Sequence, residues 1–481
     1  MTSRAHKTPE ARDHDRERLA LRREDNGLRQ MWQDPLIEKA LTLSLITLLI
    51  GHVRMLGDNG VVEGKAAEQV IEALKAMASD LKAGSNVLLN EDQDIISGIE
   101  RKLREAIGDL SEAINVGNSR SDQTAAAIRL WLRDMVKQAG ERLIALRNSV
   151  VSLAERDAEI VMPGYAHMQH TSAMFLSQWW LANDARFRRD YGRLLDLYRR
   201  LNFLPFAAGA RAQADARVDR SKVAYYLGFD GVNENSVDTI SDRDYVIEFA
   251  SFAALLAVHI SQLSSDLILW STSEFGFVRL PRSLDFRGEI IAQKRQREML
   301  EILRGKCAVI SGRLSEFLIS LKGLSLSDSQ ELHECLPGLF SIVEQLNFTL
   351  DLTLAFLPGC EFDDKRMREA ANPDLASSRH AIEFLVERDV PRERATKIVD
   401  ALVAYCKDRR KQLSDLTVNE WTQFSPAFDE NIYKSLLVDE LEIVGAVNGT
   451  NAYQGLLVRI AQARQTLESD ETLLPGQRNI N

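Results

Sequence analysis

A polar segment at residues 287–297 carries groups that could do acid–base chemistry. It reads Arg-Gly-Glu-Ile-Ile-Ala-Gln-Lys-Arg-Gln-Arg and separates two long apolar segments. Polar segments that contain a glycine often form loops, and loops held by a rigid scaffold often carry catalytic or binding groups. We therefore predict a loop at residues 287–297, where catalytic or binding chemistry is plausible.

Long helices must position this loop. Apolar residues recur at helical spacing in five long segments: 125–153, 171–202, 244–270, 299–321 and 339–357. The chain contains only 11 prolines and almost no alternating strand pattern, so long helices are uninterrupted. Residues 115–123 form a second polar loop, and residues 162–165 are predicted to form a turn. The sequence predicts an all-α fold with a central bundle of long helices.

Composition limits the classes of partner. The 481 residues include 60 Lys and Arg against 70 Asp and Glu, a net charge of −10, which argues against a nucleic acid or an anionic membrane as partner. A small anionic substrate then needs a local basic pocket. The four cysteines are scattered, no secretion signal is visible, and the apolar run Leu41–Ile50 is too short to span a bilayer. We expect a cytoplasmic protein.

Changes in charge density and in helix length along the chain suggest four regions. Residues 1–30 are dense in charge and are predicted to be a mobile tail, and residues 31–112 an N-terminal helical domain with a turn at 57–60. Residues 113–360 hold the long helices. Shorter helices with capping residues follow, so residues 361–481 are predicted to form a C-terminal helical domain.

Several stretches resemble the argininosuccinate lyases of the fumarase/aspartase superfamily. The match runs, in consistent order and spacing, through residues 119–134, 162–169, 235–244, 266–277 and 424–429. It covers roughly residues 35–465, and chance similarity between helical proteins would not reproduce it.

The resemblance implies a three-domain helical subunit whose five-helix bundles assemble into a twenty-helix homotetramer. In that family each active site combines loops from three subunits, and the reaction eliminates an amine from a succinyl group to release fumarate. A base removes the Cβ proton, and cationic and amide groups hold the resulting aci-carboxylate. The expected ligand is a small carboxylate or amino acid, and no cofactor or metal is implied.

The first matching motif is a carboxylate-binding loop. Ser119, Arg120 and Ser121 correspond to the family's S-R-N, with Ser121 in place of the amide. Arg120 offers a planar fork for a carboxylate, and the alternative is a structural ion pair with Asp122. Asn118 closes the N-V-G-N that stands where the family has H-T-G-R, so a cation and a hydroxyl are missing.

The second motif supplies a histidine. His167 and Gln169 occupy the family's T-H-x-Q, with Ala166 in place of the threonine. Glu301 falls where the family has the glutamate that orients the histidine ring, and such a pairing would raise the pKa of the imidazole. The alternative is that His167 and Glu301 are unrelated surface residues.

Residues 287–297 correspond to the family's G-S-S-x-M-P-x-K-x-N-P. Lys294 keeps the cation for the aci-carboxylate, with Gln293 beside it as a substrate-binding candidate. Gly288 stands where the family has its serine base, and glycine cannot accept a proton. Glu289 is the candidate replacement base on this loop, and its alternative is a solvated carboxylate.

Other departures affect the substrate. Ile96 stands where the family has a first-domain histidine. The segment that grips the arginine moiety in the family has Asp328, His333 and Leu336 in place of its Tyr, Gln and Lys. Ordinary argininosuccinate cleavage is therefore not expected.

Two functions remain open. The first is an enzyme of altered specificity that makes or breaks a C–N bond of a succinyl-amine or related amino acid. The second is a catalytically silent homologue that serves as a structural or regulatory homotetramer, since a fold survives the loss of a few site residues.

Overall fold

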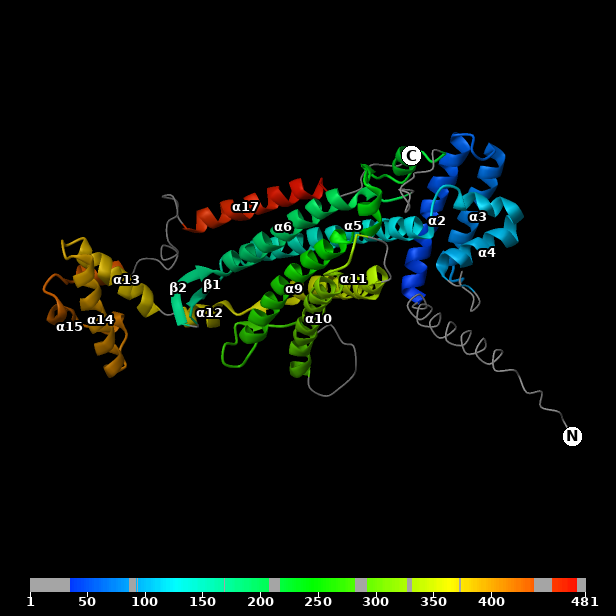
Figure 1. Ribbon diagram of the computed structural model, residues 1–481. Coiled ribbons are helices and arrows are strands. Elements are labelled where there is room, and N and C mark those ends of the chain that lie inside the picture. Colours follow the sequence, from blue (N-terminus) through cyan, green and yellow to red (C-terminus); the bar gives the residue numbers. More distant parts are fainter. Residues whose placement is uncertain are drawn as a thin grey trace, which may run out of the picture.

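The computed structural model describes residues 35–85, 92, 94–167, 169–206, 217–281, 292–326, 331–371, 373–436 and 452–473 (Figure 1). These residues form helices with three short two-stranded sheets, which confirms the all-α prediction. The predicted tail at residues 1–30 lies outside the described residues.

Three helices and a 3-10 turn form the N-terminal part. They are α2 (Pro35–Asp58), α3 (Gly64–Lys82), α4 (Ile95–Ile107) and η1 (Gly108–Asn115). Gly60 has a φ of +69° in the turn after α2, a conformation that glycine adopts without steric cost. Gly57 and Asp58 still belong to α2, so the turn predicted at 57–60 begins only at Asn59.

Five long helices form the centre, as the apolar pattern predicts (Figure 1). They are α5 (Arg120–Arg156), α6 (Leu176–Leu201), α9 (Asp244–Trp270), α10 (Ala292–Leu321) and α11 (Glu331–Phe356). Helices α5 and α6, α9 and α10, and α10 and α11 pack against each other, and one hydrophobic core joins them to α2–α4. Proline stands inside α11 at Pro337.

Short elements connect these helices. The helices among them are α7 (Arg220–Tyr226), α8 (Ser236–Ser241), η2 (Leu357–Gly359) and α12 (Asp364–Ala370). The strands are β1 (Val161–Ala166), β2 (Gln169–Phe175), β3 (Phe203–Leu204), β4 (Gly231–Val232), β5 (Val278–Arg279) and β6 (Glu361–Phe362). The β1–β2 and β5–β6 pairs are antiparallel, and the β3–β4 pair is parallel.

The β1–β2 hairpin corrects two predictions. Residues 162–165, predicted to be a turn, lie in β1, and the helix predicted from residue 171 begins at Leu176. Val161 pairs with Phe175, and both are buried. Cross-strand hydrogen bonds and this burial stabilise an extended backbone that the Pro-Gly pair alone does not reveal.

A second, smaller core lies in the C-terminal part. It is formed by α13 (Pro373–Val386), α14 (Arg392–Arg409), η3 (Leu413–Asp415), α15 (Val418–Phe424) and α16 (Asn431–Leu436). Helix α17 (Ala452–Glu471) instead packs along α5 and α6, and Met367 of α12 also belongs to the larger core. The second core thus covers only part of the domain expected at residues 361–481.

Among the residues that the structure describes, three helices are long and apolar enough to cross a membrane by length and composition alone. These segments are Ala40–Asp58, Asp244–Trp270 and Leu336–Gly359. In the apolar 18-residue stretch of each segment, 61%, 56% and 50% of the residues are buried inside the fold. Packing against other helices accounts for much of their apolar character. In α2 the apolar segment is longer than the Leu41–Ile50 run considered from the sequence.

Candidate active site

Residues 115–121 connect η1 to the first turn of α5, and a capping box fixes their course. The Ser119 side chain accepts a hydrogen bond from the Asp122 backbone N–H. The Asp122 carboxylate in turn accepts from the Ser119 N–H at 3.0 Å and from its Oγ–H at 2.6 Å. This arrangement satisfies backbone donors that the first helical turn leaves unpaired. Ser119 thus starts α5, and Ser121 lies in its first turn.

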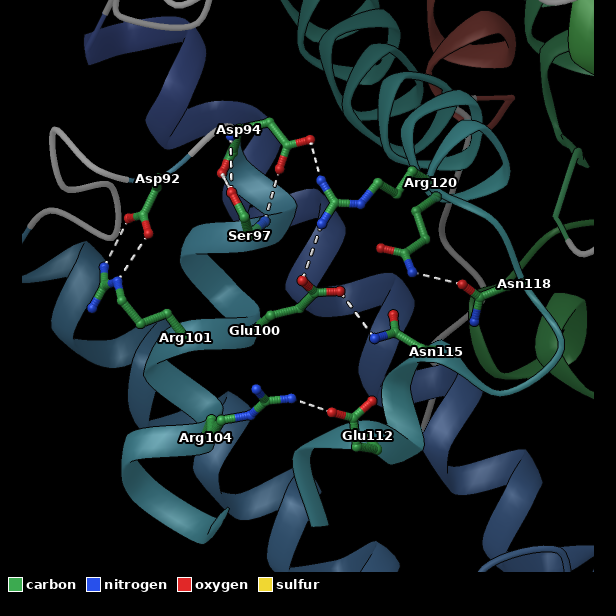
Figure 2. A network of polar contacts seen from close by, with 11 residues as sticks. Asp92, Asp94, Ser97, Glu100, Arg101, Arg104, Glu112, Asn115, Asn118 and Arg120 are labelled. Carbon is green, nitrogen blue, oxygen red and sulfur yellow. Dashed lines mark hydrogen bonds and ion pairs between the residues drawn. The ribbon is translucent and has the colours of Figure 1, made fainter. Parts of the chain in front are cut away.

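Arg120 points toward α4 and pairs with two carboxylates there (Figure 2). Its Nη1 donates to Asp94 Oδ2 at 2.7 Å and its Nη2 to Glu100 Oε2 at 3.1 Å. These partners replace the Asp122 pairing that stood as the structural alternative. The Arg120 side chain is 47% exposed, so ligands can still reach the guanidinium.

Asn118 is held by the surrounding framework. Its Nδ2 donates to the Ile114 carbonyl at 2.8 Å, and its Oδ1 accepts from Gln123 Nε2 at 2.6 Å. His52 of α2 lies beneath the same loop, with Nε2 at 2.9 Å from the Val116 carbonyl and 3.1 Å from Asn118 Nδ2. Burial lowers the pKa of His52 to about 4, so the ring is neutral near pH 7.

His167 and Gln169 lie at the turn of the β1–β2 hairpin. Both are exposed, and His167 has a φ of +52°. Positive φ is unfavourable for most side chains but is typical of tight hairpin turns. The register pairs Ala166 with Gln169, so the histidine is presented to solvent at the tip.

These two groups of residues are far apart in one chain. Helix α5 has 37 residues, which corresponds to a length of about 55 Å at 1.5 Å per residue. Arg120 is its first residue, and the hairpin that carries His167 follows its last turn, at the opposite end of the bundle (Figure 1). One substrate molecule cannot contact Arg120 and His167 of the same chain.

Helix α10 begins inside the segment predicted to be a loop. It starts at Ala292, so Gln293 and Lys294 lie in its first turn, whereas Gly288 and Glu289 lie outside the described residues. Residues 292–298 are good helix formers, and their helix continues into the apolar pattern that packs on α9. The expected loop at 287–297 is thus helical in its second half.

The first turns of α10 lie near the hairpin end of the bundle. Arg297 Nη2 donates to the Ser271 carbonyl at 2.7 Å, which ties α10 to the end of α9. Four residues further, the ring of Phe275 lies 6.3 Å from the ring of Tyr165 in β1. Lys294 therefore belongs to the same end of the bundle as His167.

The predicted pairing of His167 with Glu301 stays a prediction. Glu301 is exposed on α10. Within the described part of the chain, neither side chain has a hydrogen bond or an ion pair.

Two departures from the family motif are core residues. Ile96 is 5% exposed and Leu336 is 3% exposed, and both belong to the large hydrophobic core. Asp328 lies outside the described residues. An isoleucine and a leucine packed in the core do not donate hydrogen bonds to a substrate.

Three residues around the 115–121 loop were missed from sequence. Asp94 is the N-cap of α4 in a capping box with Ser97, and an aspartate just before a helical apolar pattern is an N-cap signal that was available. His52 is a polar residue in an apolar helix, which is a weaker signal. Glu100 lies on an ordinary helix face, and no sequence pattern connects it with Arg120.

Known families and relatives match most of the chain. Residues 41–312 match the family described as Lyase, and residues 380–441 match the family described as Argininosuccinate lyase C-terminal. An argininosuccinate lyase from Oceanobacillus iheyensis is 33% identical over 420 residues, covering 87% of this chain and 92% of the relative. The corresponding lyase from Desulforudis audaxviator is 34% identical over 419 residues, covering 87% and 91%. The chain belongs to the argininosuccinate lyase family.

Solved structures share the fold. EDDS lyase in complex with formate has a TM-score of 0.79 at 22% identity, covering 92% of this chain and 90% of that chain. The 3-carboxy-cis,cis-muconate lactonizing enzyme from Pseudomonas putida has a TM-score of 0.72 at 19% identity, covering 93% and 98%. The predicted membership of the fumarase/aspartase superfamily is confirmed. As an argininosuccinate lyase relative, the chain belongs among the carbon–nitrogen lyases.

Proposed function

We propose that the chain is a carbon–nitrogen lyase of altered specificity that makes or breaks the bond between a succinyl group and an amine. The observation that carries the proposal is the half-exposed Arg120 at one end of the bundle, with His167 and Lys294 retained at the other. A guanidinium and an ammonium suit the two carboxylates of a succinyl group. Gly288 and the buried Leu336 argue against ordinary argininosuccinate as the substrate.

The chemistry follows from these groups. A base removes the Cβ proton of the succinyl-amine, the aci-carboxylate is stabilised by Lys294, and the amine leaves after protonation, which yields fumarate. Arg120, with Ser119 and Ser121, binds the second carboxylate. His167, oriented by Glu301, and Glu289 carry the proton transfers. No metal or cofactor takes part.

The site is completed by other copies of the chain in a homotetramer. Large apolar side chains stay exposed on three central helices: Leu255 and Val258 on α9, Ile302 and Val309 on α10, and Phe348 on α11, each 39–45% exposed. Apolar residues on adjacent helices are typical of surfaces that bind another protein. Association through these helices would bring the two ends of different bundles together.

An activity assay tests the proposal. Purified protein is incubated with succinyl-amines, or with amines plus fumarate, and fumarate absorbance is followed. Fumarate is a reasonable probe because a structural neighbour is an EDDS lyase variant with bound fumarate. We expect Glu289→Gln to lower turnover at least about 100-fold, the contribution of a general base, without changing the oligomer. No turnover with any such substrate would refute the enzymatic proposal, and unchanged turnover in the variant would remove Glu289 from it.

Subunit mixing tests the composite site. Arg120→Ala and His167→Asn are each expected to be nearly inactive, and asparagine tolerates the positive φ of residue 167. Co-expression of the two variants is expected to restore a clear fraction of activity, because some sites receive both intact groups from different chains. If each site lies within one chain, the mixture stays inactive.

A silent homologue is the second candidate function. It is favoured by the ion pairs that engage Arg120 with Asp94 and Glu100, since a structural role alone would explain them. In both cases we propose a cytoplasmic homotetramer that binds neither nucleic acid nor membrane, in keeping with its net charge of −10.

A further inference from the structure

Glu100 closes the Asn115–Arg120 loop at both of its ends (Figure 2). One carboxylate oxygen, Oε1, accepts from Asn115 Nδ2 at 2.9 Å, where the loop begins. The other, Oε2, accepts from Arg120 Nη2 at 3.1 Å, where the loop ends. A single side chain of α4 thus spans the segment that contains Asn118 and Ser119.

Asp94 binds the other terminal nitrogen of the Arg120 guanidinium, Nη1. Its Oδ2 accepts from Arg120 Nη1 at 2.7 Å, and its Oδ1 accepts from the Ser97 backbone N–H at 2.8 Å. Because this second bond caps α4, the carboxylate is held by a helix terminus. Arg120 therefore meets two acceptors whose own positions are fixed.

The two acceptors leave most of the guanidinium available. Arginine has five N–H donors, and Asp94 and Glu100 each receive one hydrogen bond from a different Nη atom. The remaining donors can bind a ligand carboxylate without breaking either ion pair. Side chains of Arg120, Asp94 and Glu100 are 47%, 28% and 29% exposed, so water and salt screen the repulsion between a ligand and these carboxylates. A free arginine side chain loses rotamer entropy when it binds a ligand, and solvent does not reduce that cost. An arginine already held by two ion pairs has less rotamer entropy left to lose.

We propose that Asp94 and Glu100 are positioning residues that hold Arg120 and the Asn115–Arg120 loop in the conformation that binds a substrate carboxylate. This role rests on the proposed function, in which Arg120 binds one carboxylate of a succinyl group. It predicts that the two acidic residues favour dicarboxylate binding although their charge is negative.

The test is a double variant of Asp94 and Glu100 in which α4 keeps an N-cap residue and the Ser119 cap of α5 is unchanged. In Asp94→Ser, serine still caps α4 but cannot reach Arg120, and in Glu100→Gln the amide oxygen still accepts from Asn115. The full-length double variant is compared with the wild type for fumarate binding by calorimetry, for KM and kcat, and for hydrogen exchange in residues 112–121. The matched control is Glu112→Gln, which removes the exposed Arg104–Glu112 ion pair between α4 and η1.

We expect the dissociation constant for fumarate and the KM to rise about 5–10-fold in the double variant, with kcat changed less than about twofold, because Arg120 binds a carboxylate that does not react. Exchange in residues 112–121 should become faster, and Glu112→Gln should behave as the wild type. Equal or tighter fumarate binding by the double variant overturns the positioning role alone. Wild-type protein that binds no fumarate overturns the proposed function, and this role with it.

Discussion

Replacing Arg147 by leucine is expected to lower the free energy of unfolding by about 3–5 kcal/mol, the usual cost of leaving a buried carboxylate without its cation. Arg147 of α5 is fully buried. Its Nε donates to Asp184 Oδ1 of α6 at 2.9 Å and its Nη1 to Asp470 Oδ2 of α17 at 2.7 Å. The residue thus joins three helices, and buried Asp184 loses its hydrogen-bonded cation when Arg147 is removed. Chemical unfolding followed by circular dichroism measures the loss.

Two further variants separate burial from charge. Leucine at both positions, Arg147→Leu with Asp184→Leu, should recover much of the lost stability, because no charge then stays buried without a partner. Arg199→Gln removes an exposed ion pair with Asp196 and should change stability by less than about 1 kcal/mol. A double variant no more stable than Arg147→Leu would contradict this explanation.

Acid is expected to destabilise the protein through His52, by about 2.5 kcal/mol between pH 6.5 and pH 4. Burial lowers the pKa of the folded ring from 6.5 to about 4. The ring faces the Val116 carbonyl, Asn118 and the edge of Phe206, and none of these neighbours is charged. Above pH 6.5 the ring is neutral in both states and costs nothing. As the pH falls toward 4, His52 is protonated in the unfolded chain but stays largely neutral in the folded protein, so the free energy of unfolding decreases.

The variant His52→Gln tests this contribution. Glutamine keeps an N–H donor for the Val116 carbonyl but does not titrate. Unfolding free energies are measured at pH 7 and pH 4.5 for both proteins, because carboxylates that titrate in the same range then cancel in the comparison. The wild type should lose about 2.5 kcal/mol more than the variant over this interval. Equal losses would show that His52 does not contribute to acid sensitivity.

The helices of the central bundle were predictable from the sequence because their burial has a period. The apolar pattern at residues 244–270 coincides with α9, Asp244–Trp270, and the pattern at 125–153 lies within α5. A buried stripe repeats every three to four residues whatever the helix packs against. The β1–β2 hairpin was missed because its strands are stabilised by each other, and pairing between strands leaves little trace in a short segment.

The candidate site was predictable only as a set of residue types. The family motif identified Ser119, Arg120 and His167 by order and spacing, and the structure describes all three. It did not reveal that Arg120 pairs with Asp94 and Glu100, 26 and 20 residues away. Their contact depends on how α4 packs beside the start of α5, and side chains on separate helices carry no common sequence period.

The sequence by itself determined that the chain is all-α, that long helices form its centre, and that its motifs follow the argininosuccinate lyases. These properties depend on local periodicity and on residue order, and both can be seen directly in the sequence. Only the tertiary structure decided that Arg120 and His167 lie at opposite ends of a helix about 55 Å long. It also decided that residues 292–297 are helical and that Glu100 spans the loop at residues 115–120. The physical reason is that distances between side chains follow from the packing of whole helices, which no single segment specifies.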